Sequence, residues 1–171
     1  MRDWESFAGR QSGHRTIVSF RGASGIDGTL SLACGLAQQW QRLVLVTGDL
    51  ALLHDSNGWL WRRQLSAELR IVLIDNAGGG VFEQLPIPRQ SMDFERLFAM
   101  PQGCDAMALA AVHGVSAREC NAMESLAEDL QWLLEPGDSM RLLRCSTDRA
   151  RDALQRQQLR GRPWWEQTTA P

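Results

Sequence analysis

Residues 46–80 read VTGDLALLHDSNGWLWRRQLSAELRIVLIDNAGGG, and this stretch decides the fold of the chain. A Gly-Asp pair, Gly48 and Asp49, closes one apolar strand, and an Asp-Asn pair, Asp75 and Asn76, closes the next. The residues between the two pairs suffice for one helix and a return strand. In a parallel α/β sheet this spacing brings both polar tips to the same carboxyl edge, where such sheets bind ligands.

The residue types at these tips suit a divalent cation. The Asp49 carboxylate, the Asn76 side-chain oxygen and a backbone carbonyl near Gly78 supply oxygen ligands, which Mg²⁺ prefers. Such a set leaves room in an octahedral shell for two diphosphate oxygens and water. The stretch therefore predicts a site for a cation that bridges two phosphates.

Each of these motifs also has a simpler interpretation. Asp49 directly precedes a predicted helix and could serve only as its N-cap. Asn76 could belong to an ordinary turn, and Gly78, Gly79 and Gly80 could only permit left-handed dihedrals. Two polar residues that follow two buried strands at the spacing of one crossover favour the cation site over these separate explanations.

A second cluster, RGASGIDG at residues 21–28, follows a predicted strand and opens a helix. Small residues let a backbone approach an anion, and a helix N-terminus offers free N–H groups and a positive dipole end. Ser24, Gly25 and Asp27 fit that role, although an ordinary strand-to-helix turn has the same composition. Arg2 and Arg21 are candidates for binding substrate carboxylates, because a guanidinium pairs bidentately with them. Solvated surface arginines are the alternative.

On both sides of these motifs, the hydrophobic pattern predicts strands and helices in alternation. We expect strands at 16–20, 43–46, 69–74 and 140–145, the second and third covered on both faces. We expect helices at 30–40, 50–66, 105–112 and 122–134 and from 148 onward. Residues 77–101 are predicted to form a long loop with one short helix at 94–98, and the tail after 160 to fray. This order predicts one α/β domain over residues 1–171, with a mainly parallel sheet and helices on both faces.

Composition narrows the possible partners. The 171 residues suit a single domain, and 18 basic against 20 acidic side chains give a net charge of −2. This balance offers no case for nucleic acid or an anionic membrane, and no apolar run approaches the roughly 20 residues of a spanning helix. The four cysteines are scattered through segments predicted as core or helix, without a CxxC pair. We interpret them as reduced thiols of a cytoplasmic protein rather than metal ligands or disulfides.

Four segments together resemble one enzyme family. RGASGIDGTLS (21–31), GDLALLHDSNG (48–58), IDNAGGGVF (74–82) and FERLFAMP (94–101) are similar to the C-terminal domain of 2-succinyl-5-enolpyruvyl-6-hydroxy-3-cyclohexene-1-carboxylate synthases, the MenD type. The resemblance implies a thiamine diphosphate-binding fold, with thiamine diphosphate and Mg²⁺ (or Mn²⁺) as cofactors. It also implies a reaction that decarboxylates 2-oxoglutarate and adds the succinyl unit to isochorismate, in menaquinone or phylloquinone synthesis.

The resemblance also assigns roles to individual residues. Asp49 and Asn76 would be metal ligands, and Gly78 would contribute its carbonyl. Ile26 would support the cofactor in a bent conformation. Arg2 and Arg21 would bind substrate carboxylates, and Val81 and Phe82 would line the reaction pocket. The expected cofactor contacts are Ser24, Gly25, Ile26, Asp27, Gly48, Asp49, Leu50, Asn76, Gly78, Gly79, Val81 and Phe82.

Three departures from the family pattern matter. Leu50 follows Gly48 and Asp49 where many relatives have Gly, although Leu is usual in this branch. Asp75 stands where the family usually has Asn, which puts a second carboxylate near the cation site. The family's chain is several times longer, with an N-terminal domain whose glutamate assists the activation of the cofactor. We therefore expect a domain truncated at its N-terminus, with one sheet edge uncovered and inactive alone.

Such a domain would need an N-terminal pyrimidine-binding domain, on the full-length chain or on a partner, in a dimer or tetramer. Two other functions stay open at this point. One is a domain of another thiamine diphosphate decarboxylase or carboligase, such as acetolactate synthase. The other is a non-catalytic module for subunit assembly.

Overall fold

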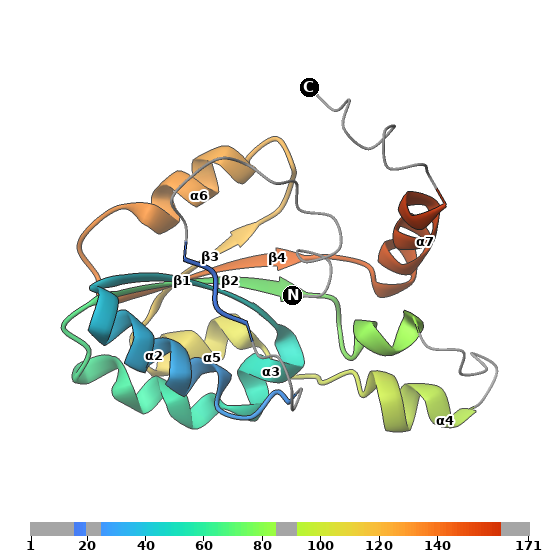
Figure 1. Cartoon of the computed structure of the whole chain (residues 1–171), viewed down its shortest axis with the longest axis horizontal. Helices are drawn as coiled ribbons and strands as arrows, with labels where there is room; N and C mark the ends of the chain where they lie inside the picture. Colours follow the sequence, from blue (N-terminus) through green and yellow to red (C-terminus); the bar gives the residue numbers. More distant parts are fainter. Residues whose placement is uncertain (1–15, 20–24, 85–91, 162–171) are drawn as a thin grey trace.

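Four parallel strands form the single sheet of this computed structural model, which describes residues 16–19, 25–84 and 92–161. The strands are β1 (Arg42–Gly48), β2 (Glu68–Asp75), β3 (Ser116–Cys120) and β4 (Met140–Ser146). Their order across the sheet is β1-β2-β4-β3, and each neighbouring pair is parallel (Figure 1). The predicted α/β architecture with a parallel sheet is therefore confirmed.

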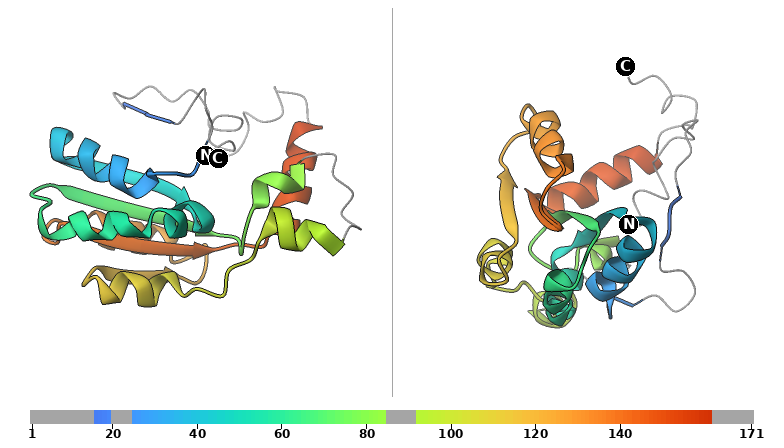
Figure 2. Two further views of the ribbon diagram at one scale, coloured as in Figure 1. Left: turned by 90° about the horizontal axis from the view of Figure 1, so that it is seen from below. Right: turned by 90° about the vertical axis from the view of Figure 1, so that its left-hand side faces the viewer.

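Helices lie on both faces of the sheet and beyond its carboxyl edge. One face is covered by α2, α3 and α5, and the opposite face by α6 (Figure 1). Helix α7 and the segment that follows β2 lie beyond the carboxyl ends of the strands (Figure 2). The helical elements are α2 (Thr29–Trp40), α3 (Asp49–His54), η1 (Ser56–Arg63), η2 (Gly80–Gln84), α4 (Met92–Phe94), η3 (Glu95–Ala99), α5 (Ala106–Val112), α6 (Leu126–Leu134) and α7 (Arg149–Arg160).

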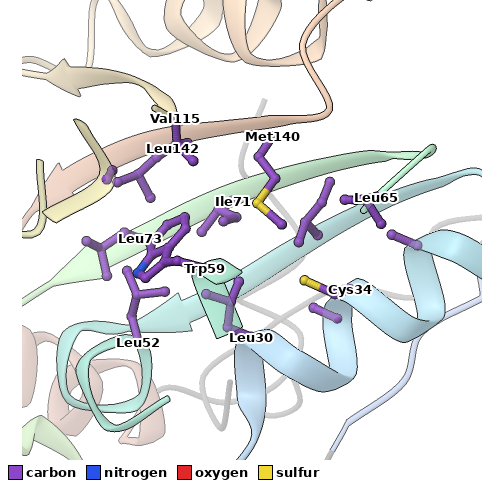
Figure 3. Packing of buried hydrophobic residues seen from close by; sticks show 14 of the residues in the cluster. Leu30, Cys34, Leu52, Trp59, Leu65, Ile71, Leu73, Val115, Met140 and Leu142 are labelled. Carbon is purple, nitrogen blue, oxygen red and sulfur yellow. The ribbon is translucent and has the colours of Figure 1, made fainter. Parts of the chain in front are cut away.

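The core lies between β2 and the helices on the α2 face of the sheet. Alternate residues of β2, Leu69, Ile71 and Leu73, are fully buried and pack with Trp59 of η1 and Leu30 of α2 (Figure 3). Full burial of a large apolar side chain contributes about 1.5–3 kcal/mol each. Because β2 lies between β1 and β4 in the sheet, the packing of this core determines the positions of the carboxyl ends of β1 and β2.

The helix predicted at 50–66 is divided into α3 and the 3₁₀ segment η1, with Asp55 between them. Gly58 of η1 packs so closely on Leu30 that a Cβ would lie 2.9 Å from that side chain. Strand β3 was not predicted, because its sequence SAREC has no apolar run. The helix predicted at 122–134 begins only at Leu126.

The strand predicted at 16–20 is wrong over the described residues 16–19, which form no strand. Ile17 and Val18 are exposed there, so this apolar run gains no burial. The expectation that both faces of β1 are covered is also wrong for the described part of the chain, since Val44 is 47% exposed. The physical reason is that α6, the helix on that face, packs on β2, β3 and β4.

All four cysteines carry free thiols. Cys34 is buried, and Cys120 and Cys145 are half-buried, but Cys104 is exposed, against the expectation that all four lie in core or helix. Among the described helices, none has both the length and the apolar character required to cross a membrane.

Candidate functional site

The carboxyl edge of β1 and β2 holds the two polar tips that the sequence singles out. Gly48 pairs with Ile74 in the strand register, so both strands end at the same level. Gly48, in extended conformation, is the N-cap of α3, and Asp49 is the first residue of that helix. The simpler interpretation of Asp49 as the N-cap is therefore wrong.

Asp49 is a buried carboxylate that contacts the glycine turn after β2. Its Oδ2 accepts a hydrogen bond of 2.6 Å from the backbone N–H of Gly78, and the residue is only 8% exposed. Burial raises the pKa of Asp49, the Gly78 hydrogen bond opposes this rise, and the negative charge of Asp75 adds to it. Within the described residues, no basic side chain forms an ion pair with Asp49, so its charge is left without a counter-ion.

The second carboxylate at this edge, Asp75, is already paired. Its Oδ2 accepts a hydrogen bond of 2.8 Å from Nε of Arg144 on β4, and its Oδ1 accepts one from the N–H of Ala77. Arg144 also contacts Glu119 on β3, at 3.3 Å. Asp75 is thus ion-paired with a side chain of the neighbouring strand, whereas Asp49 has no basic partner among the described residues.

Gly78 and Gly79, in the turn after Asn76, lie where a side chain has no room. Ala77 and Gly78 both have positive φ, 56° and 126°, and the N–H of Gly79 donates a 2.6 Å hydrogen bond to the carbonyl of Ala99. A Cβ on Gly78 would overlap the carbonyl oxygen of Ala99, and one on Gly79 would lie 2.5 Å from the carbonyl oxygen of Phe98. The turn therefore fits directly against the end of η3.

Asn76 lies beside this turn. It is half-buried, and a Cβ on Gly80 would overlap its amide nitrogen. Its side chain makes no hydrogen bond within the described part of the chain, so the amide oxygen is available as a ligand. A buried carboxylate, an amide and a close backbone turn fit a cation that takes its other ligands from phosphates. Among the described residues, no group of three or more His, Cys, Asp or Glu side chains is arranged to hold a metal ion.

The N-terminus of α2, the predicted anion site, already holds an anion from this chain. The Asp55 carboxylate accepts a 2.7 Å hydrogen bond from the N–H of Ser31 and another, at 3.1 Å, from its hydroxyl. This argues against a phosphate at the same position. Oδ1 of Asp27 lies 3.6 Å from Nε2 of His54. His54 is the last residue of α3, whereas Asp49 is the first. The cofactor contacts assigned to Gly25 and Asp27 remain predictions.

The other predicted site residues are placed as follows. Val81 and Ile26 are exposed, at 42% and 41%, and Phe82 packs edge-on against Phe98 with the ring centroids 5.8 Å apart. Leu50 is half-buried in α3. Arg2, Arg21 and Ser24 lie outside the described residues.

Sequence reasoning missed several residues that shape this edge: Glu83, Glu95, Arg144 and Arg149. Arg144 and Arg149 form ion pairs with acidic residues from distant segments, so no local spacing marks them.

Two enzymes among the solved structures have a similar fold. A Mycobacterium smegmatis protein described as a thiamin diphosphate-dependent enzyme matches 72% of this chain and 22% of its own length, with a TM-score of 0.57 and 18% identity. Benzoylformate decarboxylase from Polynucleobacter necessarius matches 70% of this chain and 23% of its own length, with a TM-score of 0.55 and 17% identity. The fold is thus one found in thiamine diphosphate-dependent enzymes.

Comparison with known sequences indicates a narrower group of relatives than comparison of the folds. The 2-succinyl-5-enolpyruvyl-6-hydroxy-3-cyclohexene-1-carboxylate synthase of Synechococcus sp. (strain RCC307) is 86% identical over all 171 residues, which is 30% of its length. The synthase of Parasynechococcus marenigrum (strain WH8102) is 57% identical over 160 residues, 29% of its length. No family model matches the chain. In sequence, the chain is therefore related over its whole length to one segment of these synthases, and it spans about 30% of their length.

Proposed function

We propose that this chain is the thiamine diphosphate- and Mg²⁺-binding domain of a 2-succinyl-5-enolpyruvyl-6-hydroxy-3-cyclohexene-1-carboxylate synthase, the C-terminal part of that enzyme. The observation that supports this most strongly is the 86% identity to such a synthase along the entire chain. At that identity, an acetolactate synthase-like activity or a purely structural module is not favoured.

On this proposal the chain holds the cofactor by its diphosphate. Asp49, Asn76 and the carbonyl of Gly78 would bind Mg²⁺ (or Mn²⁺), and the cation would be a counter-ion for the buried carboxylate of Asp49. When bound, thiamine diphosphate supplies an electron sink for the negative charge that remains after a 2-oxo acid loses carbon dioxide. Ile26 would support the cofactor in its bent conformation, and Val81 and Phe82 would line the reaction pocket.

The complete reaction, the decarboxylation of 2-oxoglutarate and the transfer of the succinyl unit to isochorismate, belongs on this proposal to a protein of the relatives' full length. An N-terminal pyrimidine-binding domain, a dimeric or tetrameric assembly and a cytoplasmic location are parts of the same proposal. Arg2 and Arg21 are its candidate ligands for the substrate carboxylates.

Binding of the cofactor by the purified chain tests the proposal. Titration calorimetry and thermal unfolding are measured with thiamine diphosphate, Mg²⁺ and both together. We expect weak stabilisation that needs both ligands and is lost in Asp49→Ala. Glu124→Ala, which removes an exposed carboxylate, is the matched control and should respond like the parent. The same thermal response in Asp49→Ala and in the parent would contradict the proposal.

A second experiment tests the reaction. The chain alone is expected to give no isochorismate-dependent turnover, whereas the assembled full-length protein should use 2-oxoglutarate. Pyruvate in place of 2-oxoglutarate distinguishes this synthase from an acetolactate synthase-like ligase. Turnover with pyruvate and none with 2-oxoglutarate would refute the assigned substrate.

A further inference from the structure

Arg149, the first residue of α7, contacts both segments that enclose the glycine turn. Its Nε lies 3.2 Å from Oε1 of Glu83 on η2. Its Nη2 donates to both carboxylate oxygens of Glu95 on η3, each at 2.8 Å. The Arg149 side chain is 17% exposed and that of Glu83 only 6%, so the first of these pairs is shielded from water.

These two ion pairs join η2 and η3, the two elements that the Gly78–Gly80 turn contacts. Gly79 donates to the carbonyl of Ala99, the last residue of η3, and its own carbonyl accepts from Phe82 of η2. The stem of Arg149 also reaches the turn itself, since a Cβ on Gly80 would lie 3.5 Å from Cγ of Arg149. The turn is thus held between η2 and η3, and Arg149 ties these two elements together from outside.

We propose that Arg149 is a positioning residue, which clamps η2 to η3 and thereby holds the Gly78–Gly80 turn in place beside Asp49. Loss of the clamp would let η3 move away from the turn. The bond from the Gly79 N–H to Ala99 would then open, and the Gly78 backbone would lose its fixed position against the Asp49 carboxylate. The consequence for cofactor binding rests on the proposed function, whereas the clamp itself does not.

The simultaneous contacts of residue 149 with Glu83 and Glu95 require a guanidinium group. Two separate nitrogens of its planar fork reach Glu83 and Glu95 at the same time, whereas a lysine ammonium is one point charge on a flexible stem. Arg149→Lys should therefore recover only part of the effect that Arg149→Met removes. Arg151, an exposed arginine two residues further along α7, provides the matched control for loss of charge.

Amide hydrogen exchange of the full chain tests the clamp without any ligand. In Arg149→Met we expect the amides of Gly79 and Phe82 to exchange at least 10-fold faster, while the core amides of Ile71 and Leu73 stay within 2-fold of the parent. Arg149→Lys should be intermediate and Arg151→Met unchanged. Unprotected Gly79 in the parent, or equal acceleration of turn and core amides in Arg149→Met, would overturn the proposal.

Glu95→Gln provides a second variant, in case Arg149→Met does not fold. It keeps the arginine and weakens the link to η3, so the Gly79 amide should again exchange faster, and Arg149→Met/Glu95→Gln should add little to Arg149→Met alone. Fully additive effects, or parent-like exchange in Glu95→Gln, would refute the clamp.

Calorimetry with thiamine diphosphate and Mg²⁺ then tests the consequence for binding. We expect the Kd to rise at least 5-fold in Arg149→Met and to stay at the parent value in Arg151→Met. A parent that binds no cofactor would contradict the proposed function, while the exchange data would still decide on the clamp. Faster exchange of Gly79 with an unchanged Kd would show that the clamp does not serve the cofactor site.

Discussion

At the residue scale, Asp49 is a carboxyl group whose burial disfavours the ionised form. Burial raises its pKa above the ordinary 3.8, and the nearby Asp75 carboxylate adds to this effect. For a carboxyl group whose pKa is raised by folding, the folded state binds the proton more tightly than the unfolded state. The contribution of this carboxyl group to stability is then greatest at low pH and falls as the pH rises above about 4 through the folded-state pKa.

The first prediction follows for Asp49→Asn. In the absence of cations at pH 7 this variant should be more stable than the parent, because the amide removes the buried charge and can still accept from Gly78. The difference should shrink as the pH is lowered towards 4, where the parent carboxyl becomes protonated. Urea unfolding at several pH values measures both effects, and a variant less stable than the parent at pH 7 would contradict the prediction.

The second prediction concerns Gly78. Its φ of 126° is one that L side chains rarely adopt, and a Cβ would meet the carbonyl of Ala99. Gly78→Ala should therefore lower the free energy of unfolding by about 3 kcal/mol. Gly103→Ala is the control, because nothing lies within 4 Å of its added Cβ, and it should change stability by less than about 0.5 kcal/mol. Equal stability of the two variants would show that the turn can rearrange.

At the scale of elements, the start of α2 depends on a residue from another segment. Gly28 is its N-cap and offers no side-chain hydrogen bond, and Asp55, between α3 and η1, supplies the missing acceptor for Ser31. A carboxylate near a helix N-terminus also interacts favourably with the helix dipole. The segment between β1 and β2 thus stabilises the helix that precedes β1.

The third prediction tests this capping. Asp55→Ala should destabilise the chain by about 1–2 kcal/mol, as expected for the loss of an N-terminal cap. Ser31→Ala removes only the hydroxyl contact and should cost less, since the backbone N–H still donates to Asp55. Chemical unfolding of both variants provides the comparison. A larger loss in Ser31→Ala than in Asp55→Ala would contradict the capping role.

At the scale of the whole molecule, access to the core requires the sheet and the α2 layer to separate. Cys34 of α2 belongs to this core, and burial raises the pKa of its thiol to about 11, with the charge of Asp55 as a further cause. At pH 8 the reactive thiolate is then roughly 100-fold rarer than for an ordinary thiol. Alkylation of Cys34 therefore reports on opening of the core.

The fourth prediction is an order of alkylation. With iodoacetamide at pH 8, exposed Cys104 should be labelled first, and Cys34 should react only at the rate at which the core opens. Urea should accelerate the labelling of Cys34 far more than that of Cys104. Mass spectrometry of peptides measures both sites. Comparable rates in native buffer would mean that the α2 layer is not firmly packed.

Sequence reasoning succeeded where a local pattern carries the information. The continuous apolar runs before Asp49 and Asp75 predict β1 and β2, and the period of Leu30, Ala33 and Ala37 predicts α2. It failed where the local pattern is weak or misleading. Strand β3 is mostly polar and forms because β4 offers it an edge, whereas the apolar run at 16–19 finds no strand partner among the described residues.

The sequence by itself thus determined that this chain forms a parallel α/β sheet and that Asp49 and Asn76 follow neighbouring strands at one edge. The length of a strand and of the crossover that follows it restricts the positions at which the chain can leave the sheet. Only the tertiary structure decided which charges at that edge are paired: Asp75 with Arg144, Glu83 and Glu95 with Arg149, and Asp49 with no basic side chain in the described part of the chain. These pairs join residues far apart in sequence, so their distances depend on how the elements pack.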